Sequence, residues 1–213
     1  MSHMANKLVI LDRDGTLNVD RDDYVKSADE FEPLPGALEA IAQLNHAGFF
    51  VAVATNQSGL GRGLFDMAAL NAMHSKMNKL LAAVGGRIDA VFFCPHSPEE
   101  SCACRKPLPG LYEQIGERLG LPLHDVPVVG DSLRDLQAAV VVGAQPHLVL
   151  TGKGASLRGQ PLPANYPAQT MVHQDLAAFV AHILHLAPDG GPEGEDRKST
   201  RLNSSHLGIS YAV

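Results

Sequence analysis

Short apolar runs alternate along this chain with longer stretches in which apolar residues recur every three or four positions. Runs of this kind are typical of buried strands, and the longer recurrence is typical of helices with one buried face. The runs predict strands at 8–11, 49–54, 88–93, 126–129 and 147–150, and the recurrences predict helices at 37–47, 67–84, 111–119, 133–142 and 176–186. Strands that alternate with helices predict an α/β fold in which helices cover both faces of a parallel sheet.

Residues at the starts and on the faces of the predicted helices are interpreted as structural. Asp66 is the predicted N-cap of the helix over 67–84, and Asp175 that of the last helix. The apolar stripe of the longer helix predicts a face buried in the core rather than a cofactor site. Packed or solvated side chains, rather than metal ligands, are expected at four helical histidines: His46, His74, His182 and His185.

Polar residues that could bind a ligand or take part in catalysis follow the predicted strands. Asp12-Arg13-Asp14-Gly15-Thr16-Leu17 follows the first strand, Thr55-Asn56-Gln57-Ser58 the second, and Gly130-Asp131-Ser132 the fourth. The carboxyl ends of parallel strands meet at one edge, where open α/β sheets bind ligands. Two carboxylates two residues apart repel each other unless a cation or a reaction accounts for them, and Mg²⁺ with a phosphoryl group supplies both. An ordinary Asp-rich turn is the alternative for the first motif taken alone.

Composition limits the possible functions. The chain has 213 residues, 45% hydrophobic and 19% charged, which is ordinary for a globular protein of one or two domains. No apolar run approaches ~20 residues, and no signal peptide is recognised, so we expect neither a membrane span nor secretion. The net charge of −6 argues against nucleic acid as a partner, because such binding needs a basic face. Three cysteines cannot form a closed disulfide framework, which favours the cytoplasm.

The sequence predicts one folded domain at 7–187. We interpret residues 1–6 as a tag or leader. Residues 188–213 have the composition of a flexible linker followed by a segment that resembles translated vector sequence, and we expect a disordered, non-native tail there. A genuine disordered tail is the alternative. Nothing in the sequence demands more than a monomer.

Four sulfur and nitrogen ligands lie within eleven residues: Cys94, His96, Cys102 and Cys104. Three thiolates and one imidazole can close a tetrahedral Zn²⁺ site that leaves no position for substrate, so the predicted zinc is structural. The loop has little apolar surface of its own, and metal binding would order it. Since Arg105 and Lys106 follow the last ligand, zinc would also fix where these two cations point.

A fourth motif, Arg105-Lys106-Pro107, lies just ahead of a predicted helix. Together with the three strand-end motifs it resembles the pattern of the haloacid dehalogenase-like phosphatases, in the right order and across most of residues 8–135. The resemblance implies a Rossmann-like doubly wound parallel sheet without a large cap, and a magnesium-dependent phosphatase. It implies that Asp12 is the nucleophile that forms an aspartyl-phosphate. Asp14 would protonate the leaving hydroxyl and then activate water, while Thr55 and Lys106 would hold the phosphoryl oxygens. Mg²⁺ would be bound by the Asp12 carboxylate, the Asp14 backbone carbonyl and Asp131.

The zinc loop narrows the resemblance to two branches, the D,D-heptose 1,7-bisphosphate phosphatases and the histidinol-phosphate phosphatases. Ser58, Arg105 and the motif at 151–154 are similar to the heptose branch, which implies removal of the 7-phosphate of the sugar bisphosphate, in lipopolysaccharide precursor synthesis. Histidinol phosphate is the alternative substrate. A DNA-end 3′-phosphatase and a non-catalytic zinc-stabilised binding domain are further rivals. Candidate substrate contacts are Asp20, Tyr24, Asn56, Gln57, Ser58, Arg105 and Ser132.

Two further polar residues have less certain roles. Asp135 either orients Lys106 or a metal-bound water, or stabilises the N-terminus of a helix through its dipole. Arg62 is a weaker candidate for substrate binding, because an arginine flanked by glycines is usually solvated.

Overall fold

A computed structural model describes residues 7–186 and shows one six-stranded parallel sheet in the order β3-β2-β1-β4-β5-β6. The predicted termini, 1–6 and 188–213, lie outside the described residues. The strands are β1 (Leu8–Leu11), β2 (Phe50–Asn56), β3 (Ala90–Cys94), β4 (Pro127–Gly130), β5 (Gln145–Val149) and β6 (Met171–His173). The helices are α1 (Ala37–His46), α2 (Ser58–Gly61), α3 (Met67–Ala83), α4 (Gly110–Leu119), α5 (Leu133–Val141) and α6 (Leu176–Leu186), with a 3₁₀ helix, η2, at Gly152–Leu157.

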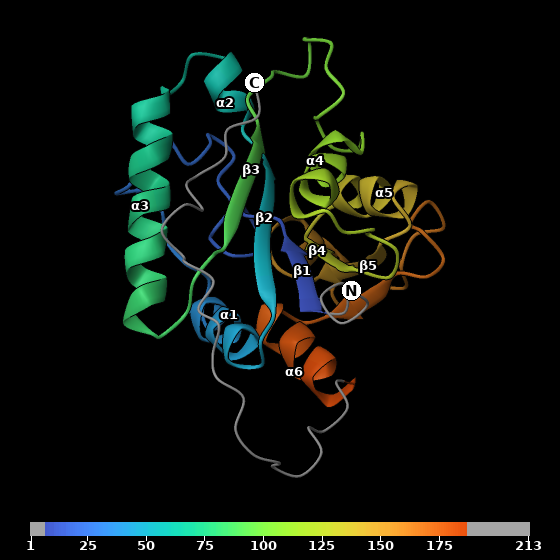
Figure 1. The fold of residues 1–213 in the computed structure, drawn as a ribbon. Coiled ribbons are helices and arrows are strands. Elements are labelled where there is room, and N and C mark those ends of the chain that lie inside the picture. The colour runs from blue at the N-terminus through green and yellow to red at the C-terminus, as the bar shows by residue number, and fades with distance from the viewer. Residues whose placement is uncertain (1–6, 187–213) are drawn as a thin grey trace.

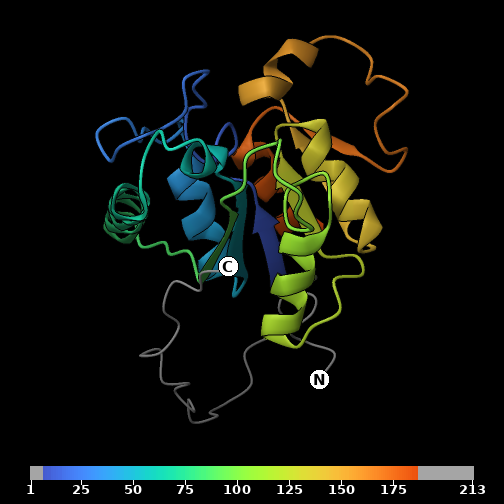
Figure 2. The same ribbon diagram turned by 90° about the horizontal axis from the view of Figure 1, so that it is seen from above.

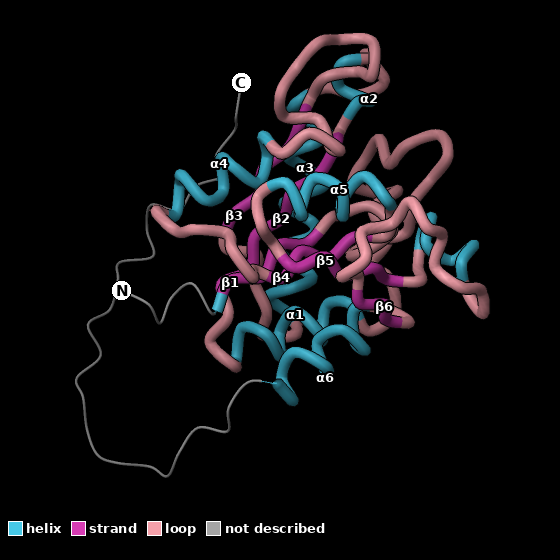
Figure 3. The backbone as a smooth tube through the Cα atoms, turned by 90° about the vertical axis from the view of Figure 1, so that its right-hand side faces the viewer, coloured by secondary structure: helices cyan, strands magenta, loops and turns pink. Residues whose placement is uncertain are grey.

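The sheet has an apolar core on each face because successive side chains of a strand point in opposite directions. In β1, Val9 and Leu11 pack towards α1, α3 and α6, whereas Leu8 and Ile10 pack towards α4 and α5. Figure 1 shows α3 on one side of the strands and α4 and α5 on the other. Figure 3 shows the resulting layers, with α4 and α5 on one side of the strands and α1 and α6 on the other. The predicted doubly wound α/β fold is therefore confirmed. No helix within 7–186 has both the length and the apolar character that crossing a membrane requires.

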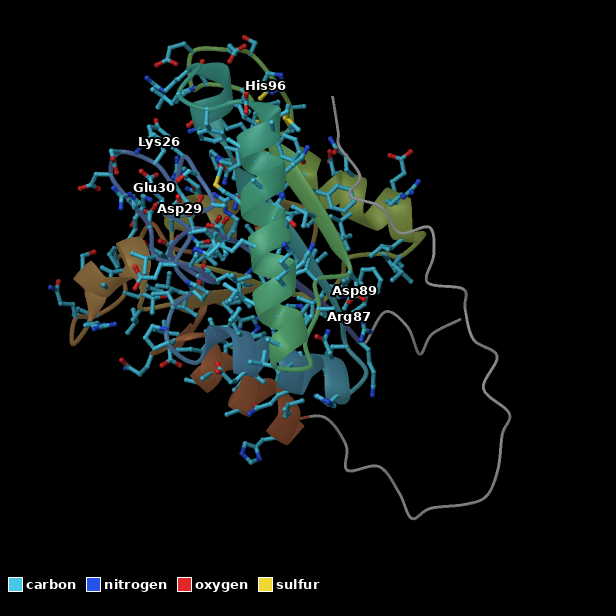
Figure 4. All side chains as sticks on the ribbon, turned by 90° about the vertical axis from the view of Figure 1, so that its left-hand side faces the viewer. Lys26, Asp29, Glu30, Arg87, Asp89 and His96 are labelled. Carbon is cyan, nitrogen blue, oxygen red and sulfur yellow. The ribbon has the colours of Figure 1, made fainter. Side chains whose placement is uncertain are left out.

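Some element boundaries differ from the prediction. The strand predicted from residue 88 begins at Ala90, because the Asp89 carboxylate accepts the hydrogen bond of Val51 N at 2.8 Å where a strand carbonyl would otherwise lie. Arg87 holds this carboxylate from the other side, with Nε 2.7 Å from Oδ1, and Figure 4 shows the pair at the end of β3 away from His96. Three short elements were not predicted: α2, η2 and β6.

Between β1 and α1 the chain forms an opening loop, residues 18–33, without a helix or an extended strand. Lys26 stabilises it, with Nζ 2.7 Å from Asp23 Oδ2 and 3.4 Å from Glu30 Oε2 (Figure 4). Lys76 of α3 donates to Ala28 O at 2.7 Å and ties the loop to the helix layer. Within 7–186 this loop and the segment after β5 take the place of a large cap over the sheet edge.

Candidate active site

The carboxyl ends of the strands surround a pocket of about 250 Å³. Figure 2 shows the opening loop (blue) and the segment after β5 (orange) as two projections on the same side of the molecule. All seven predicted substrate contacts and all five residues given catalytic or magnesium roles line the pocket: Asp12, Asp14, Asp20, Tyr24, Thr55, Asn56, Gln57, Ser58, Arg105, Lys106, Asp131 and Ser132. The fold thus brings together residues that are up to 120 positions apart (12 to 132) in the sequence.

Lys106 lies between two carboxylates at the bottom of the pocket. Its Nζ is 2.9 Å from Asp12 Oδ1 and 2.6 Å from Asp135 Oδ1, and it also donates to Ala54 O at 2.8 Å. Burial raises the pKa of Asp12 to about 6, against the opposing effect of Lys106. Although burial would lower the pKa of Lys106, Asp12 and Asp135 outweigh it and raise that pKa, so the ammonium stays charged.

Asp135 combines the two roles between which the sequence left a choice. One carboxylate oxygen, Oδ1, contacts Lys106, and Oδ2 accepts from Ser132 N at 3.0 Å and from Ser132 Oγ at 2.6 Å. The latter bonds form a capping box at the start of α5. Burial would raise the pKa of Asp135, but Lys106 outweighs it and lowers the pKa. The bonds of Ser132 make it part of this helix cap at the pocket wall.

Asp131 is enclosed by two glycines. A Cβ built on Gly15 would lie 2.0 Å from Asp131 Oδ2, and one built on Gly152 would lie 2.2 Å from the same oxygen. Both glycines have positive φ, +82° and +49°, so the backbone also favours glycine there. Lys153 N donates to Asp131 Oδ2 at 2.7 Å. Burial, with Asp12 and Asp135 nearby, raises the pKa of Asp131 to about 8.

These groups fit a divalent cation with oxygen ligands. Asp12, Asp131 and Asp135 each offer a carboxylate oxygen, all within 4.8 Å of one another. Since both oxygens of Asp135 are engaged by Lys106 and Ser132, Asp12 and Asp131 are the ones suited to bind the ion. The buried Asp131 and Asp135 and the partly buried Asp12 place three carboxylates around one ammonium, and a bound cation would offset the repulsion that helps to raise the pKa of Asp131. Hard oxygen donors match Mg²⁺.

Asp14 is held from three directions. Arg13 Nη2 lies 2.9 and 3.0 Å from its two oxygens, Asn18 Nδ2 donates to Oδ1 at 2.9 Å, and Gln57 Nε2 donates to Oδ2 at 2.9 Å. Burial would raise the pKa of Asp14, but Arg13 and the hydrogen bonds outweigh it and hold the pKa below its ordinary value. The sequence predicted Asp14 but not its supports Arg13 and Asn18, whose only signal was their position within and just after the first strand-end motif.

The motif at residues 55–58 supports its neighbours, and its first two residues are the last two of β2, which extends beyond the predicted end at residue 54. Gln57 Nε2 bridges Asp14 and Thr55 Oγ1, the latter at 2.9 Å. Asn56 forms hydrogen bonds with the backbone of Lys106 through both ends of its amide. Gln57 is 3% exposed and Ser58 7%. Asn56 and Gln57, predicted as substrate contacts, line the pocket and also form hydrogen bonds that orient Lys106 and Asp14.

The pocket mouth carries cations that sequence reasoning did not select. Lys153 Nζ pairs with the carboxylate of Asp20 across the gap between the opening loop and the segment after β5. Arg21 and Arg134 also line the pocket. Lys153 belongs to the motif at 151–154, which resembles the heptose branch, but the sequence predicted no role for the Lys153 side chain.

Arg62 lies outside the set of residues that line the pocket. Its Nη2 lies 3.1 Å from Glu99 Oε1 in an exposed ion pair. Such pairs contribute little to stability because solvent screens them.

The cysteine-rich loop brings its four predicted ligands together. Cys94, His96, Cys102 and Cys104 each offer one ligand atom, a thiol sulfur or a ring nitrogen, and these four atoms lie within 4.8 Å of one another. Cys94 Sγ is 3.8 Å from Cys102 Sγ, which matches the edge of about 3.8 Å that a tetrahedron with Zn–S bonds of ~2.3 Å has. His96 Nδ1 lies 3.5 Å from Cys94 Sγ and 3.4 Å from Cys104 Sγ, so this donor set fits a closed zinc site.

This loop connects to the pocket through Arg105, whose Nη1 donates to His96 O at 3.4 Å. Gln57 N donates to Cys94 O at 2.8 Å, which joins the start of the loop to the motif at residues 55–58. In Figure 4, His96 lies beside the top of α3 and α2, at the same end of the molecule as the opening loop.

Two family models match the chain. One, described as HAD-hydrolase-like, matches residues 103–179, and the other, described as polynucleotide kinase 3 phosphatase, matches residues 7–132. Together they cover all four motifs that line the pocket.

Curated relatives match over almost their full length. The D-glycero-beta-D-manno-heptose-1,7-bisphosphate 7-phosphatase of Bordetella bronchiseptica is 55% identical over 181 residues, which are 85% of this chain and 99% of the relative. The enzyme of the same name from Pseudomonas aeruginosa is 50% identical over 181 residues, with the same coverage of 85% and 99%.

Solved structures show the same fold. The D,D-heptose 1,7-bisphosphate phosphatase from B. bronchiseptica, complexed with magnesium and phosphate, matches with a TM-score of 0.81 and 55% identity over 85% of this chain and 99% of the other. A HAD-like phosphatase from Mesorhizobium loti matches with a TM-score of 0.66 and 31% identity, over 90% and 88%.

Proposed function

The chain belongs to the haloacid dehalogenase-like phosphatases and, within them, to the family of the D-glycero-beta-D-manno-heptose-1,7-bisphosphate 7-phosphatases. We therefore propose that it removes the 7-phosphate from D-glycero-D-manno-heptose 1,7-bisphosphate. The chain is a phosphatase, and this activity supplies a precursor of the lipopolysaccharide core. The observation that carries the proposal is Asp12 beside Lys106, with Asp14 and Asp131 at the same sheet edge.

The reaction proceeds in two displacements at phosphorus. A carboxylate oxygen of Asp12 forms a bond to phosphorus while the bond from phosphorus to the sugar O7 breaks, and O7 takes a proton from Asp14. Water then attacks the aspartyl-phosphate, Asp14 takes a proton from that water, and the bond from phosphorus to Asp12 breaks. The incoming phosphate adds negative charge next to Asp14, which favours the protonated form that the first step needs.

Charge on the phosphoryl oxygens is stabilised by fixed groups. Lys106 Nζ, held by Asp135, and Thr55 Oγ1, held by Gln57, lie ready to donate to these oxygens. The Asp12 carboxylate, the Asp14 carbonyl and Asp131 would hold Mg²⁺, which supplies further positive charge when bound. Magnesium and phosphate are present in the related Bordetella structure, which supports this assignment.

A second phosphate and a sugar fit the pocket mouth. Arg105 can bind a phosphate bidentately, and Lys153 and Arg134 add positive charge on the other wall. Asp20, Tyr24 and Ser58 are proposed to contact the sugar hydroxyls. Histidinol phosphate carries an ammonium group and one phosphate, so these cations favour the bisphosphate over it.

We include in the proposal a structural Zn²⁺ bound by Cys94, His96, Cys102 and Cys104, which positions Arg105 through His96. A reducing cytoplasm keeps such thiols available as ligands. We propose a monomer.

The test compares phosphate release, with Mg²⁺, from the heptose bisphosphate, histidinol phosphate and a 3′-phosphorylated oligonucleotide. We expect strong preference for the bisphosphate, with the 1-phosphate retained in the product by ³¹P NMR. Preference for histidinol phosphate, or salt-sensitive turnover of the oligonucleotide, would transfer the chain to another activity. Asp12→Asn should abolish turnover while fold and metal content persist; unchanged turnover in that variant would refute the mechanism.

A further inference from the structure

A buried histidine outside the pocket contacts the catalytic loop. His74 lies on the inner side of α3 and is 0% exposed, and its Nε2 lies 3.3 Å from Nη1 of Arg13, which is also 0% exposed. Neither residue was predicted to have a role, and His74 is absent from the pocket wall. Its only polar contact described in the structure is therefore with the arginine between the two catalytic aspartates.

The chemistry of arginine fixes the tautomer of this histidine. A guanidinium donates hydrogen bonds and accepts none, so His74 Nε2 must accept and the ring proton must be on Nδ1. His74 Nδ1 is buried without a hydrogen-bond partner. Burial and Arg13 lower the pKa of His74 to about 3, so the ring is neutral. An apolar side chain at this position would avoid the cost of the unpaired N–H. The favourable polar contribution of the imidazole is therefore the hydrogen bond that Nε2 accepts from Arg13.

Arg13 transmits this contact to Asp14. Its Nε and Nη2 form a fork on the Asp14 carboxylate, with Nε 3.0 Å from Oδ1 and Nη2 2.9 and 3.0 Å from the two oxygens. Nη1, on the other side of the same planar group, is the atom that contacts His74. Because the guanidinium is rigid, an acceptor at Nη1 limits rotation of the fork and hence of the carboxylate.

We propose that His74 is a positioning residue for proton transfer: it fixes Arg13, and Arg13 fixes the Asp14 carboxyl group that protonates the leaving oxygen. This inference rests on the proposed function. When the bond from phosphorus to the leaving oxygen breaks, a sugar alkoxide needs the proton of Asp14, whereas p-nitrophenolate is stable without it. A displaced Asp14 therefore slows the transfer from a sugar phosphate and leaves the transfer from p-nitrophenyl phosphate nearly unchanged.

The test measures kcat/KM for both substrates in His74→Phe and His74→Gln, since kcat/KM reports the steps up to aspartyl-phosphate formation. We expect His74→Phe to lose about tenfold with the sugar phosphate, a fraction of the roughly 10²–10⁴-fold that positioned proton transfer contributes. The loss with p-nitrophenyl phosphate should stay below about twofold on the same grounds. His74→Gln restores an acceptor and should recover most of the difference.

Controls separate positioning from packing. Met77→Leu, another buried change on the inner side of α3, should leave the ratio of the two kcat/KM values at the wild-type level. If His74→Phe does not fold, Arg13→Lys keeps the charge without the fork and should shift the ratio in the same direction. Equal losses on both substrates in these variants would overturn the inference. Failure of the wild-type protein to hydrolyse the sugar phosphate would instead count against the proposed function.

Discussion

Asn56 binds the backbone of Lys106 at both ends of its side-chain amide: Nδ2 donates to Lys106 O at 3.0 Å, and Oδ1 accepts from Lys106 N at 3.1 Å. This pair joins the end of β2 to the loop that carries the ammonium proposed to stabilise the transferring phosphoryl group. Asn56 thereby sets the direction in which Lys106 leaves the backbone, which makes it a positioning residue in addition to part of the pocket wall.

Asn56→Ala should reduce activity while the fold persists. The two hydrogen bonds are worth about 1–3 kcal/mol together, which corresponds to a roughly 5- to 160-fold fall in kcat/KM if Lys106 loses its orientation. Asn56→Asp should not rescue activity, because a carboxylate cannot donate to Lys106 O. Steady-state kinetics beside thermal unfolding measure both effects.

Asn45→Ala is the matched control. Asn45 is also a buried asparagine that binds backbone groups, with Oδ1 2.8 Å from Arg87 N, but it does not line the pocket. We expect it to lower the melting temperature and leave kcat/KM intact. Equal kinetic losses in both variants would show that Asn56 acts only through stability.

Gly15→Ala should disable the magnesium site. The new Cβ would overlap Asp131 Oδ2 at 2.0 Å, and a displacement of about 1 Å at a catalytic group costs about 10²-fold in rate. We therefore expect at least this loss in kcat and a higher Mg²⁺ requirement, measured by titrating the metal against activity.

Gly63→Ala provides the control for backbone strain. Gly63 also has positive φ, +68°, but a Cβ there would meet nothing within 4 Å. It should cost about 1–2 kcal/mol of stability, as for any L-residue in this region, with no change in magnesium dependence. A similar magnesium dependence in both variants would contradict the contact with Asp131 as the cause.

Cys104→Ser should release the zinc proposed for the cysteine-rich loop. We expect bound zinc to fall from one equivalent towards zero, the melting temperature to fall by about 5–10 °C, and activity to fall because Arg105 loses its support at His96. Metal analysis by mass spectrometry with thermal unfolding measures these losses. Ser101→Ala, an exposed change in the same loop, should keep zinc, stability and activity. Full retention of stability in metal-free Cys104→Ser would exclude a structural role for zinc.

Much of this architecture could be predicted because local pattern and position along the chain determine it. Strand β1 and helix α6 have the predicted bounds, and the strand-end motifs meet because parallel strands place their carboxyl ends together. The short elements were missed for a local reason: β6 has three residues at the sheet edge, two of them exposed, so it shows no buried run. Strand β5 covers Gln145–Val149 rather than the predicted 147–150. It can include Pro146, which has no N–H to donate, because β6 pairs with β5 only from His147 onward.

The bonds within the site could not be predicted, because they depend on tertiary distance rather than on spacing. Asn56 and Lys106 are 50 residues apart and Arg13 and His74 are 61 residues apart. The sequence placed Asn56 and Gln57 near the substrate because they follow a strand. Only the structure shows that their amides support Lys106, Asp14 and Thr55. The residue types at a strand end therefore indicate where the site is, but they do not distinguish residues that bind substrate from residues that position other side chains.

Acid should destabilise the protein through histidines beneath the sheet edge. Burial lowers the pKa of His147 from 6.5 to about 3, and it lowers that of the partly exposed His173 to about 4; His147 Nδ1 lies 2.9 Å from His173 Nε2. Below pH 6.5 the unfolded chain binds more protons than the folded one, so stability is present above this pH and is lost as pH falls towards about 4 for His173 and about 3 for His147.

The variant His147→Gln keeps a polar partner for His173 and cannot titrate. Between pH 7.5 and 5.5 one such histidine removes about 1.4 kcal/mol, or about 3–6 °C in melting temperature for a domain of this size. We expect the fall in melting temperature over this interval to be smaller by that amount in His147→Gln, measured by calorimetry. His124→Gln, at an exposed site, should retain the full wild-type fall. An identical fall in His147→Gln and wild type would mean that His147 gains its proton without unfolding.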